Sequence, residues 1–514
     1  MKKLRCLAGG CLFLAVLACV PAIAQTALEF TARGMTEASE GKDVEAITDY
    51  SKAIALDPKL ASAYYNRSLV YNRQKDYEKS LDDLNRALEL APDHRSALLN
   101  RGRVYRELGK YDLALADFTK LTELMPNDFI AYGDIADVYR RTKDYDRAIE
   151  FMTAAIKCNG TYAPAYGRRA WLLTEKKQYE AAIADYNKAI ELDPKHKENY
   201  YNRAWIYGEM RENSRAIEDY GRALALDPKY VAALTNRAIL YLDEDDLDKG
   251  GNDIDAALAL DPKFEIARRT RGKLLEQKGD LTGSISEYTA AIQLDPKDSS
   301  AYVMRSVIFR QKGDLAAAAA DLAKAGELNP KNHEVPWGLG TLFVKQGKYD
   351  AAVDQYSKAI ALKPGTAELF FLRSRAQFYL GRNKEAFDDL STSLALPHSS
   401  RDPQLFDLAV GYFALKRDKH DNEARAFIAG WAERFDSPAR STLLRFLNGD
   451  ASAADLIAGA KSPDDLTVAH AWIGEMEMCA GNMDRARENF KWVIDKGEKG
   501  VAYDFAAAEL KRTP

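Results

Sequence analysis

Large apolar side chains recur along the chain every 34 residues, from Tyr50 to Leu390. Two further positions of each period carry only Gly, Ala or Ser, and a proline closes most periods, from Pro58 to Pro364. Within a period the apolar residues follow the spacing of a helix and not the alternation of a strand. Because proline ends helices, as does Gly160 at the one exception, each period predicts two helices and a turn. The chain is therefore predicted to be all-α.

Eleven such repeats span residues 27–400 when the closing proline is numbered position 32. Positions 8 and 20 are small in every repeat, as at Gly102 and Ala114, and position 24 is a large apolar residue such as Phe118. Two helices approach closely only where side chains are small, so positions 8 and 20 mark the predicted contact between the two helices of a repeat. One helix pair cannot bury its own apolar face, so stacked repeats should share a continuous core.

The spacing of 34, the small residues at positions 8 and 20 and the closing proline together resemble the tetratricopeptide repeat family. The resemblance covers residues 27–400. It implies an all-α, right-handed superhelical solenoid of 34-residue helix-turn-helix repeats. It also implies a protein-binding role, although the fold alone does not identify a partner.

The 34-residue spacing is lost after Pro397, and residues 401–466 are predicted to form degenerate helical repeats. Residues 467–514 are predicted to form a closing tetratricopeptide-like repeat and a C-terminal cap, because the pattern returns at Gly474, Ala486 and Phe490. Segments 444–450, 470–475 and 480–484 resemble a family of bacterial envelope tetratricopeptide lipoproteins. That resemblance implies that the solenoid docks a periplasmic protease and cell-wall hydrolases.

The first 24 residues differ in character from the rest of the chain. Three basic residues at positions 2, 3 and 5 precede an uncharged apolar run over residues 7–20, and Ala22 to Ala24 fit the signal-peptidase rule. Residues 1–24 are therefore predicted to be a secretory signal peptide, and the mature chain to be periplasmic or secreted. The run is too short for a comfortable transmembrane helix, so no span is expected in the mature chain. Alternatively, residues 16–19 resemble a lipobox, which would make the chain a lipoprotein anchored at Cys19.

Composition narrows the class of protein further. The chain has 514 residues, of which 46% are hydrophobic and 29% charged, as in soluble globular proteins. Its formal charge is −4, and it lacks the basic footprint of a nucleic-acid binder. Outside the signal segment only Cys158 and Cys479 remain, far apart in a linear array, so no disulfide framework is predicted.

Motifs for catalysis or metal binding are absent from the sequence. No two of the six histidines are three or four residues apart, and there is no HExxH, CxxC, GxSxG or P-loop motif. A reaction needs a constellation of groups, and the sequence offers none. We therefore predict no catalytic residue, no metal, no cofactor and no enzymatic activity.

Position 7 is arginine in nine of the eleven repeats, and position 23 is acidic in the same nine, as at Arg203 and Asp219. The two exceptions lose both charges together, with Ile135 and Phe151 in repeat 4 and Leu339 and Gln355 in repeat 10. A buried arginine needs a bonded anion, so the pattern predicts an ion pair within each repeat. The alternative is a cationic ladder for an anionic ligand, but a ligand-facing arginine would not need its own acid.

The concave groove of such repeats is lined by positions 5, 6, 9, 12 and 13 of the first helix. Asparagine at position 6 can both donate to and accept from a peptide backbone, which resembles the ladder in the tetratricopeptide domain of protein O-GlcNAc transferase. Tryptophan, tyrosine and arginine are the usual hot-spot residues of interfaces. Trp171 and Trp205 share position 9 in adjacent repeats and are expected to stack on one wall; alternatively, both are core residues and the asparagines are merely tolerated. The predicted partner-binding residues are Tyr65, Asn66, Arg73, Asn100, Arg103, Arg106, Arg140, Arg141, Trp171, Tyr201, Asn202, Trp205 and Asn236.

These observations favour a non-enzymatic scaffold or adaptor of the bacterial cell envelope that binds peptide segments or partner proteins in its groove. One alternative is a structural subunit of an envelope assembly or secretion complex. A third hypothesis is a regulatory subunit of a peptide- or glycan-processing enzyme.

Overall fold

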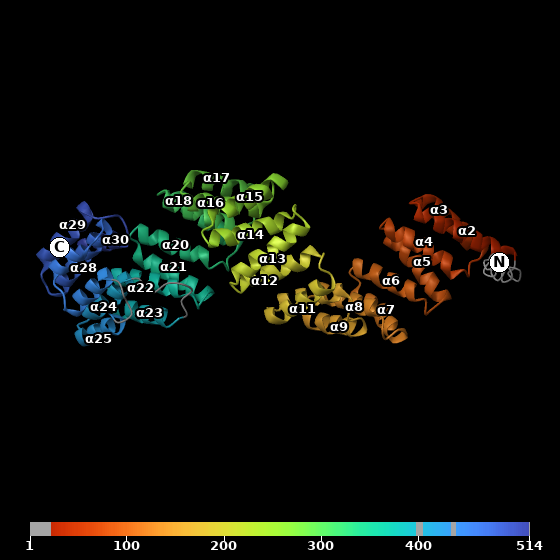
Figure 1. The fold of residues 1–514 in the computed structure, drawn as a ribbon, viewed down its shortest axis with the longest axis horizontal. Helices are drawn as coiled ribbons and strands as arrows, with labels where there is room; N and C mark the ends of the chain where they lie inside the picture. The colour runs from red at the N-terminus through yellow and green to blue at the C-terminus, as the bar shows by residue number, and fades with distance from the viewer. Residues whose placement is uncertain (1–21, 397–404, 433–437, 513–514) are drawn as a thin grey trace, which may run out of the picture. The chain divides into compact units, whose positions relative to one another are not determined.

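The computed structural model describes residues 22–396, 405–432 and 438–512, which form helices and no strand (Figure 1). Most of the predicted signal peptide, including Cys19, lies outside the described residues. The chain divides into two compact units, Met1–Leu240 and Tyr241–Pro514, with the boundary inside α14 (Val231–Asp243). None of the described helices combines the length and the apolar character that a membrane span requires.

Unit 1 is a series of helix pairs in which each helix packs on the next along the chain (Figure 1). Short turns join the helices, and each pair corresponds to one 34-residue repeat. The helices before α14 are α2 (Ala22–Ser39), α3 (Asp43–Leu56), α4 (Ala61–Arg73), α5 (Tyr77–Leu90), α6 (Arg95–Glu107), α7 (Tyr111–Leu124), α8 (Phe129–Arg141), α9 (Tyr145–Cys158), α10 (Ala163–Glu175), α11 (Tyr179–Leu192), α12 (Lys197–Glu209) and α13 (Asn213–Leu226).

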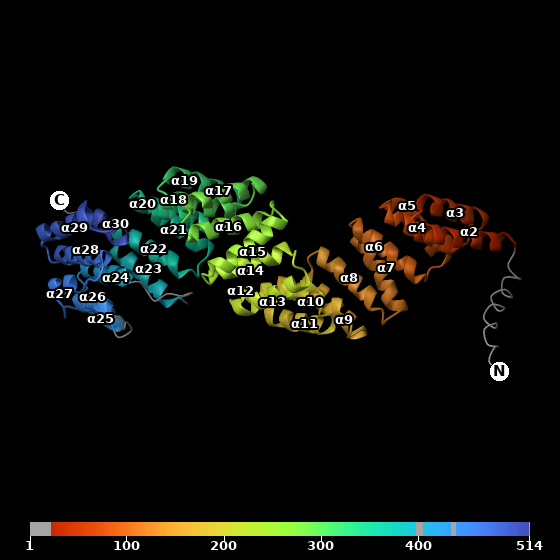
Figure 2. The same ribbon diagram turned by 45° about the horizontal axis from the view of Figure 1, so that its top comes forward.

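Unit 2 continues the same paired packing and then departs from the 34-residue period. Helices α28, α29 and α30 pack together near the C-terminus (Figure 2). The helices of this unit after α14 are α15 (Leu247–Leu260), α16 (Glu265–Gln277), α17 (Leu281–Leu294), α18 (Ser299–Gln311), α19 (Leu315–Leu328), α20 (Glu334–Lys345), α21 (Tyr349–Leu362), α22 (Ala367–Tyr379), α23 (Asn383–Ala395), α24 (Leu405–Arg417), α25 (Asp421–Ala432), α26 (Pro438–Asn448), α27 (Ala453–Gly459), α28 (Pro463–Cys479), α29 (Met483–Lys496) and α30 (Val501–Leu510).

The small residues at positions 8 and 20 lie where the two helices of a repeat meet, as predicted. The Ser80 hydroxyl at position 20 donates to the Ser68 carbonyl at position 8, with the two oxygens 3.0 Å apart. Position 8 also faces the large residue at position 24: a Cβ atom built on Gly102 would lie 2.6 Å from Cε1 of Phe118. The packing of that buried ring over the glycine recurs in the repeats with glycine at position 8, where Gly34, Gly272 and Gly340 also lie under an aromatic ring at position 24.

Position 15 adopts a left-handed backbone at the turn between the two helices. Glycine suits this conformation and stands there in several repeats, as at Gly109, where φ is 72°. Other repeats place an L-residue in the same conformation, as at Lys177, where φ is 58°. The sequence pattern did not predict this strain.

The predicted ion pair between the two helices of a repeat is confirmed as a bidentate contact in seven repeats, which lie in both units. Arg169 on α10 donates from Nε and Nη2 to the two carboxylate oxygens of Asp185 on α11, each at 2.7 Å. Its third nitrogen, Nη1, donates to the Thr153 hydroxyl of the preceding repeat at 3.0 Å. One arginine therefore ties together three helices. The other bidentate pairs are Arg33–Asp49, Arg67–Asp83, Arg101–Asp117, Arg203–Asp219, Arg305–Asp321 and Arg373–Asp389.

Repeats 4 and 8 show two variations of this pair. In repeat 4 an aromatic contact replaces the charges, because the ring of Phe151 stacks on that of Tyr139 with centroids 5.5 Å apart. In repeat 8 Glu287 is shared: it lies 3.0 Å from Arg268 and 3.8 Å from Arg271.

The C-terminal helices close the array around a fully buried tryptophan, Trp472 on α28. The ring of Phe413 stacks on it at 5.2 Å, and that of Phe505 from α30 lies 4.9 Å away. Beside them Arg417 donates to Glu475 at 2.6 Å and pairs with Glu509 at 3.0 Å. Both carboxylates are fully buried; Arg417 is shared between them, and Arg512 also donates to Glu509 at 3.1 Å.

Candidate functional site

The first helices of repeats 3, 4 and 5 enclose a pocket with a volume of about 660 Å³ in unit 1. Helices α6, α8 and α10 supply most of its walls, and α9 adds Met152 and Ala155. Four of the thirteen predicted binding residues line it: Arg103, Arg106, Arg140 and Trp171. The pocket lies on the face where positions 5, 6, 9 and 12 were expected to form a groove.

A glycine at position 5 of repeat 4 opens this pocket. Gly133 stands where repeats 2, 3 and 6 carry Tyr65, Leu99 and Tyr201. Only one atom would lie within 4 Å of a Cβ built on Gly133, Nη1 of Arg168 at 4.0 Å. The missing side chain therefore leaves a space that its neighbours do not fill.

Asp134 lies in the pocket and accepts hydrogen bonds from two of its arginines. It is 8% exposed, and the Nε of Arg103 donates to one of its oxygens at 2.9 Å. Arg106 donates to the other oxygen at 2.6 Å. Both arginines are therefore held in place by an acid of the neighbouring repeat and are already neutralised in part.

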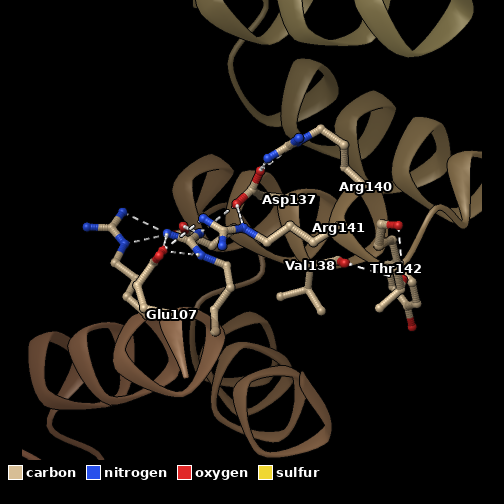
Figure 3. Close-up of polar contacts among 10 residues, drawn as sticks. Glu107, Asp137, Val138, Arg140, Arg141 and Thr142 are labelled. Atoms are coloured by element: carbon tan, nitrogen blue, oxygen red, sulfur yellow. Dashed lines mark hydrogen bonds and ion pairs between the residues drawn. The ribbon is translucent and has the colours of Figure 1, made fainter. Parts of the chain in front are cut away.

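A second acid, Asp137, holds the arginines at the end of α8 (Figure 3). Its carboxylate accepts from Arg140 at 2.8 Å and from Arg141 at 3.2 Å, while Arg141 also donates to Glu107 at 2.9 Å. Burial acts to raise the pKa of Asp137. The hydrogen bond from Arg140 and the nearby arginine charges outweigh that effect, and the pKa is lowered. Asp137 therefore stays ionised at neutral pH.

Arg168 differs from the other arginines of the pocket. It is exposed on α10, and the described part of the chain gives its guanidinium no hydrogen bond or ion pair. Beside it, the Trp171 ring lies 5.8 Å from the Arg140 guanidinium and meets the Tyr145 ring edge-on at 6.2 Å. The lining thus holds four arginines against two aspartates, which leaves it positively charged.

The predicted asparagine and tyrosine residues make contacts between repeats. The side-chain amide of Asn100 donates to the Tyr65 hydroxyl at 3.2 Å, and that of Asn236 donates to the Tyr201 hydroxyl at 3.0 Å. Each pair joins position 6 of one repeat to position 5 of the repeat before it. These amides are therefore already engaged in bracing the groove wall.

The remaining predicted residues lie outside the pocket. Arg73 pairs with Asp43 of repeat 1, and Asn66 and Asn202 are half-buried on α4 and α12. Trp205 is 40% exposed on α12. The expected stacking of Trp171 on Trp205 is wrong, since no ring contact joins them in the part of unit 1 that the structure describes, and Trp171 packs against Tyr145 instead.

Sequence reasoning missed three residues that shape the pocket: Gly133, Asp137 and Arg168. The sequence does contain a signal for Gly133, because position 5 is glycine in repeats 4 and 5 and a large residue in the repeats on either side. For metal chemistry, no group of three or more His, Cys, Asp or Glu side chains among the described residues could hold an ion.

Stacked helix-turn-helix units that share one core define a helical-repeat protein. Tetratricopeptide repeat models match residues 59–127, 163–196, 99–164, 269–333 and 185–218, and a further model of the same repeat matches residues 34–75 and 340–381. The chain belongs to the tetratricopeptide repeat family. It is a helical scaffold suited to protein–protein interaction.

Solved structures of similar fold have low sequence identity. A tetratricopeptide repeat protein from Parabacteroides merdae is 20% identical, with 48% of this chain and 97% of that chain covered and a TM-score of 0.44. Yeast Tom70 is 19% identical, with 80% and 97% covered and a TM-score of 0.41. The APC/C hetero-tetramer Cut9–Hcn1 is 16% identical, with 83% and 97% covered and a TM-score of 0.45. No curated protein gives a significant match.

Proposed function

We propose that this chain is an exported, non-enzymatic adaptor of the bacterial cell envelope that holds an acidic segment of a partner protein in the pocket of unit 1. The observation that carries the proposal is the guanidinium of Arg168. It lines a positively charged pocket and has no ion-pair partner in the described part of the chain. A carboxylate of a bound segment supplies that partner.

The size and lining of the pocket favour part of a polypeptide as its ligand. About 660 Å³ is within the range of roughly 300–1,000 Å³ typical of ligand pockets. Trp171 and the arginines are of the residue types that dominate binding energy at interfaces. A hydrogen bond to a charged group contributes about 1.5–3 kcal/mol. The contact of one acidic side chain with Arg168 should therefore give a measurable difference in binding affinity.

The envelope location rests on the predicted signal peptide of residues 1–24, and the partner class rests on the resemblance of the C-terminal segments to envelope lipoproteins. A periplasmic protease or a cell-wall hydrolase is accordingly the proposed partner. Mass spectrometry of the chain from its native host tests the location. A mature chain that begins at Gln25 or at a lipid-modified Cys19 supports export, and an uncleaved chain in the cytoplasm contradicts it.

A fluorescent probe peptide of alternating glutamate and glycine tests the pocket directly. We expect Arg168→Glu to weaken binding of this probe by at least about tenfold, or roughly 1.4 kcal/mol, because a repelling charge replaces an attracting one. Lys229→Glu is the matched control, since it makes the same charge change at an exposed site of unit 1 outside the pocket lining. Equal loss in both variants, or loss in neither, contradicts the proposal.

A further inference from the structure

A second pocket, of about 250 Å³, lies in unit 2 between the first helices of repeats 9 and 10, α18 and α20. Its walls are largely apolar and include Val303, Val307, Leu342 and the half-buried ring of Trp337. Arg310 is the one arginine in the lining.

The repeat positions relate this pocket to the one in unit 1. Arginine occupies position 12 in repeats 3, 4 and 9 alone, as Arg106, Arg140 and Arg310, and all three residues line a pocket. In both units the following repeat contributes a tryptophan, although from different positions: Trp171 from position 9 in unit 1 and Trp337 from position 5 in unit 2. The two pockets are therefore built from the same two side-chain types on successive first helices.

The acids that pair with arginines in the pocket of unit 1 have no counterpart at the same positions of repeat 9, and the one acid in this lining is Glu334 of repeat 10. At position 9, Asp137 of repeat 4 holds Arg140, whereas repeat 9 carries Val307. At position 6, Asp134 is replaced by Met304. The half-buried Arg310 consequently has no acid partner among the described residues, although even a partly buried charge favours one.

We propose that this pocket is a second binding site, which takes one large apolar side chain of an extended peptide together with the carboxylate next to it. A volume of about 250 Å³ is below the roughly 300 Å³ at which small-molecule pockets begin, so it suits a single side chain. The carboxylate completes the charge of Arg310 by a charge-assisted hydrogen bond. The exposed Glu334 also lines the pocket, and its charge disfavours a second acidic residue in the bound peptide.

The test uses the full chain with Arg168→Glu as background, so that binding in unit 1 does not contribute. The probe is a fluorescent peptide with the sequence Gly-Ser-Phe-Asp-Gly-Ser, measured by anisotropy up to millimolar concentration. Two comparison peptides replace Phe by Ala or Asp by Lys. We expect one saturable site for the probe and at least about tenfold weaker binding of both comparison peptides.

Two variants assign that site to the pocket. Arg310→Gln removes the cation, and Val307→Asp supplies the internal acid that repeat 4 has; each should weaken probe binding by at least about tenfold. Lys331→Glu, an exposed change outside the lining, should leave binding unchanged. Circular dichroism and the urea midpoint confirm that each variant is folded. Absent binding, equal binding of the Lys-containing peptide, or unchanged affinity in Arg310→Gln overturns the proposal and leaves the role of unit 1 untouched.

Discussion

Arg203 and Asp219 face each other across the two helices of repeat 6, with Nε and Nη2 of the arginine 2.6 and 2.8 Å from the two carboxylate oxygens. The third nitrogen of Arg203 donates to Asn187 of repeat 5. The side chain of the arginine is 12% exposed and that of the aspartate 5%, so the pair is largely shielded from solvent. This bridge joins neighbouring repeats as well as the two helices of one repeat.

Replacing Arg203 by leucine should destabilise unit 1 by about 3–5 kcal/mol, because it strands the buried Asp219 without a cation. The double variant Arg203→Leu with Asp219→Gln copies the residues found in repeat 10, and it should recover most of that loss. Urea denaturation followed by circular dichroism measures both. If the Arg203→Leu variant were stable but no longer bound its ligand, the arginines at position 7 would be assigned to ligand binding and not to stability.

Arg33 provides the matched control for that substitution. It makes the same bidentate contact with Asp49, but its side chain is 55% exposed and Lys52 also pairs with Asp49. Arg33→Leu should therefore shift the urea midpoint far less than Arg203→Leu. Equal shifts would show that burial does not set the strength of the bridge.

Lys177→Gly should stabilise unit 1 by about 1 kcal/mol, because residue 177 has a left-handed backbone that disfavours a Cβ atom. Lys177→Ala removes the same charge and keeps the Cβ, so it should give no such gain. Thermal unfolding compares the two variants. A gain in both would trace the effect to the lysine charge.

The stability of unit 2 should depend on pH through Glu475. Burial raises the pKa of Glu475 to about 7, although Arg417 opposes the shift. A carboxyl group whose pKa is higher in the folded than in the unfolded state stabilises the fold fully below the unfolded pKa, which is about 4.5 for Glu475. This stabilisation is lost as the pH rises to the folded pKa of about 7. Glu475→Gln cannot titrate, so its urea midpoint should change less than that of the wild type between pH 4.5 and 7. Parallel pH profiles would assign the dependence to other groups.

The repeat and its ion pair could be predicted from sequence because both recur with the period. Arg203 and Asp219 stand at fixed positions, and the two charges disappear together at Leu339 and Gln355. The third contact is only partly encoded in the same way: position 25 of the preceding repeat is polar at Asn187, but it is Gly221 before Arg237 and Thr119 before the break at Ile135.

The pocket could not be predicted in the same way, because it depends on departures from the repeat. Gly133 opens the space, and Asp137 decides which arginines are already paired. The direction of a side chain could not be predicted either. Asn100 is predicted to bind a peptide backbone, but in the structure its amide donates to the Tyr65 hydroxyl of the preceding repeat. The residues proposed for the groove therefore stay a prediction, with Arg168 added to them.

The central claim, that the pocket of unit 1 binds an acidic segment, is tested most directly by Gly133→Leu. The substitution puts a side chain into the pocket at a position where Leu99 stands in repeat 3, and it replaces a helical glycine by a better helix former. Gly430→Leu, at an exposed helical glycine of unit 2, is the control. The measurement is the affinity of the glutamate–glycine probe. We predict a folded Gly133→Leu variant with at least about tenfold weaker binding and an unchanged control, whereas wild-type affinity in a folded Gly133→Leu variant would contradict the account.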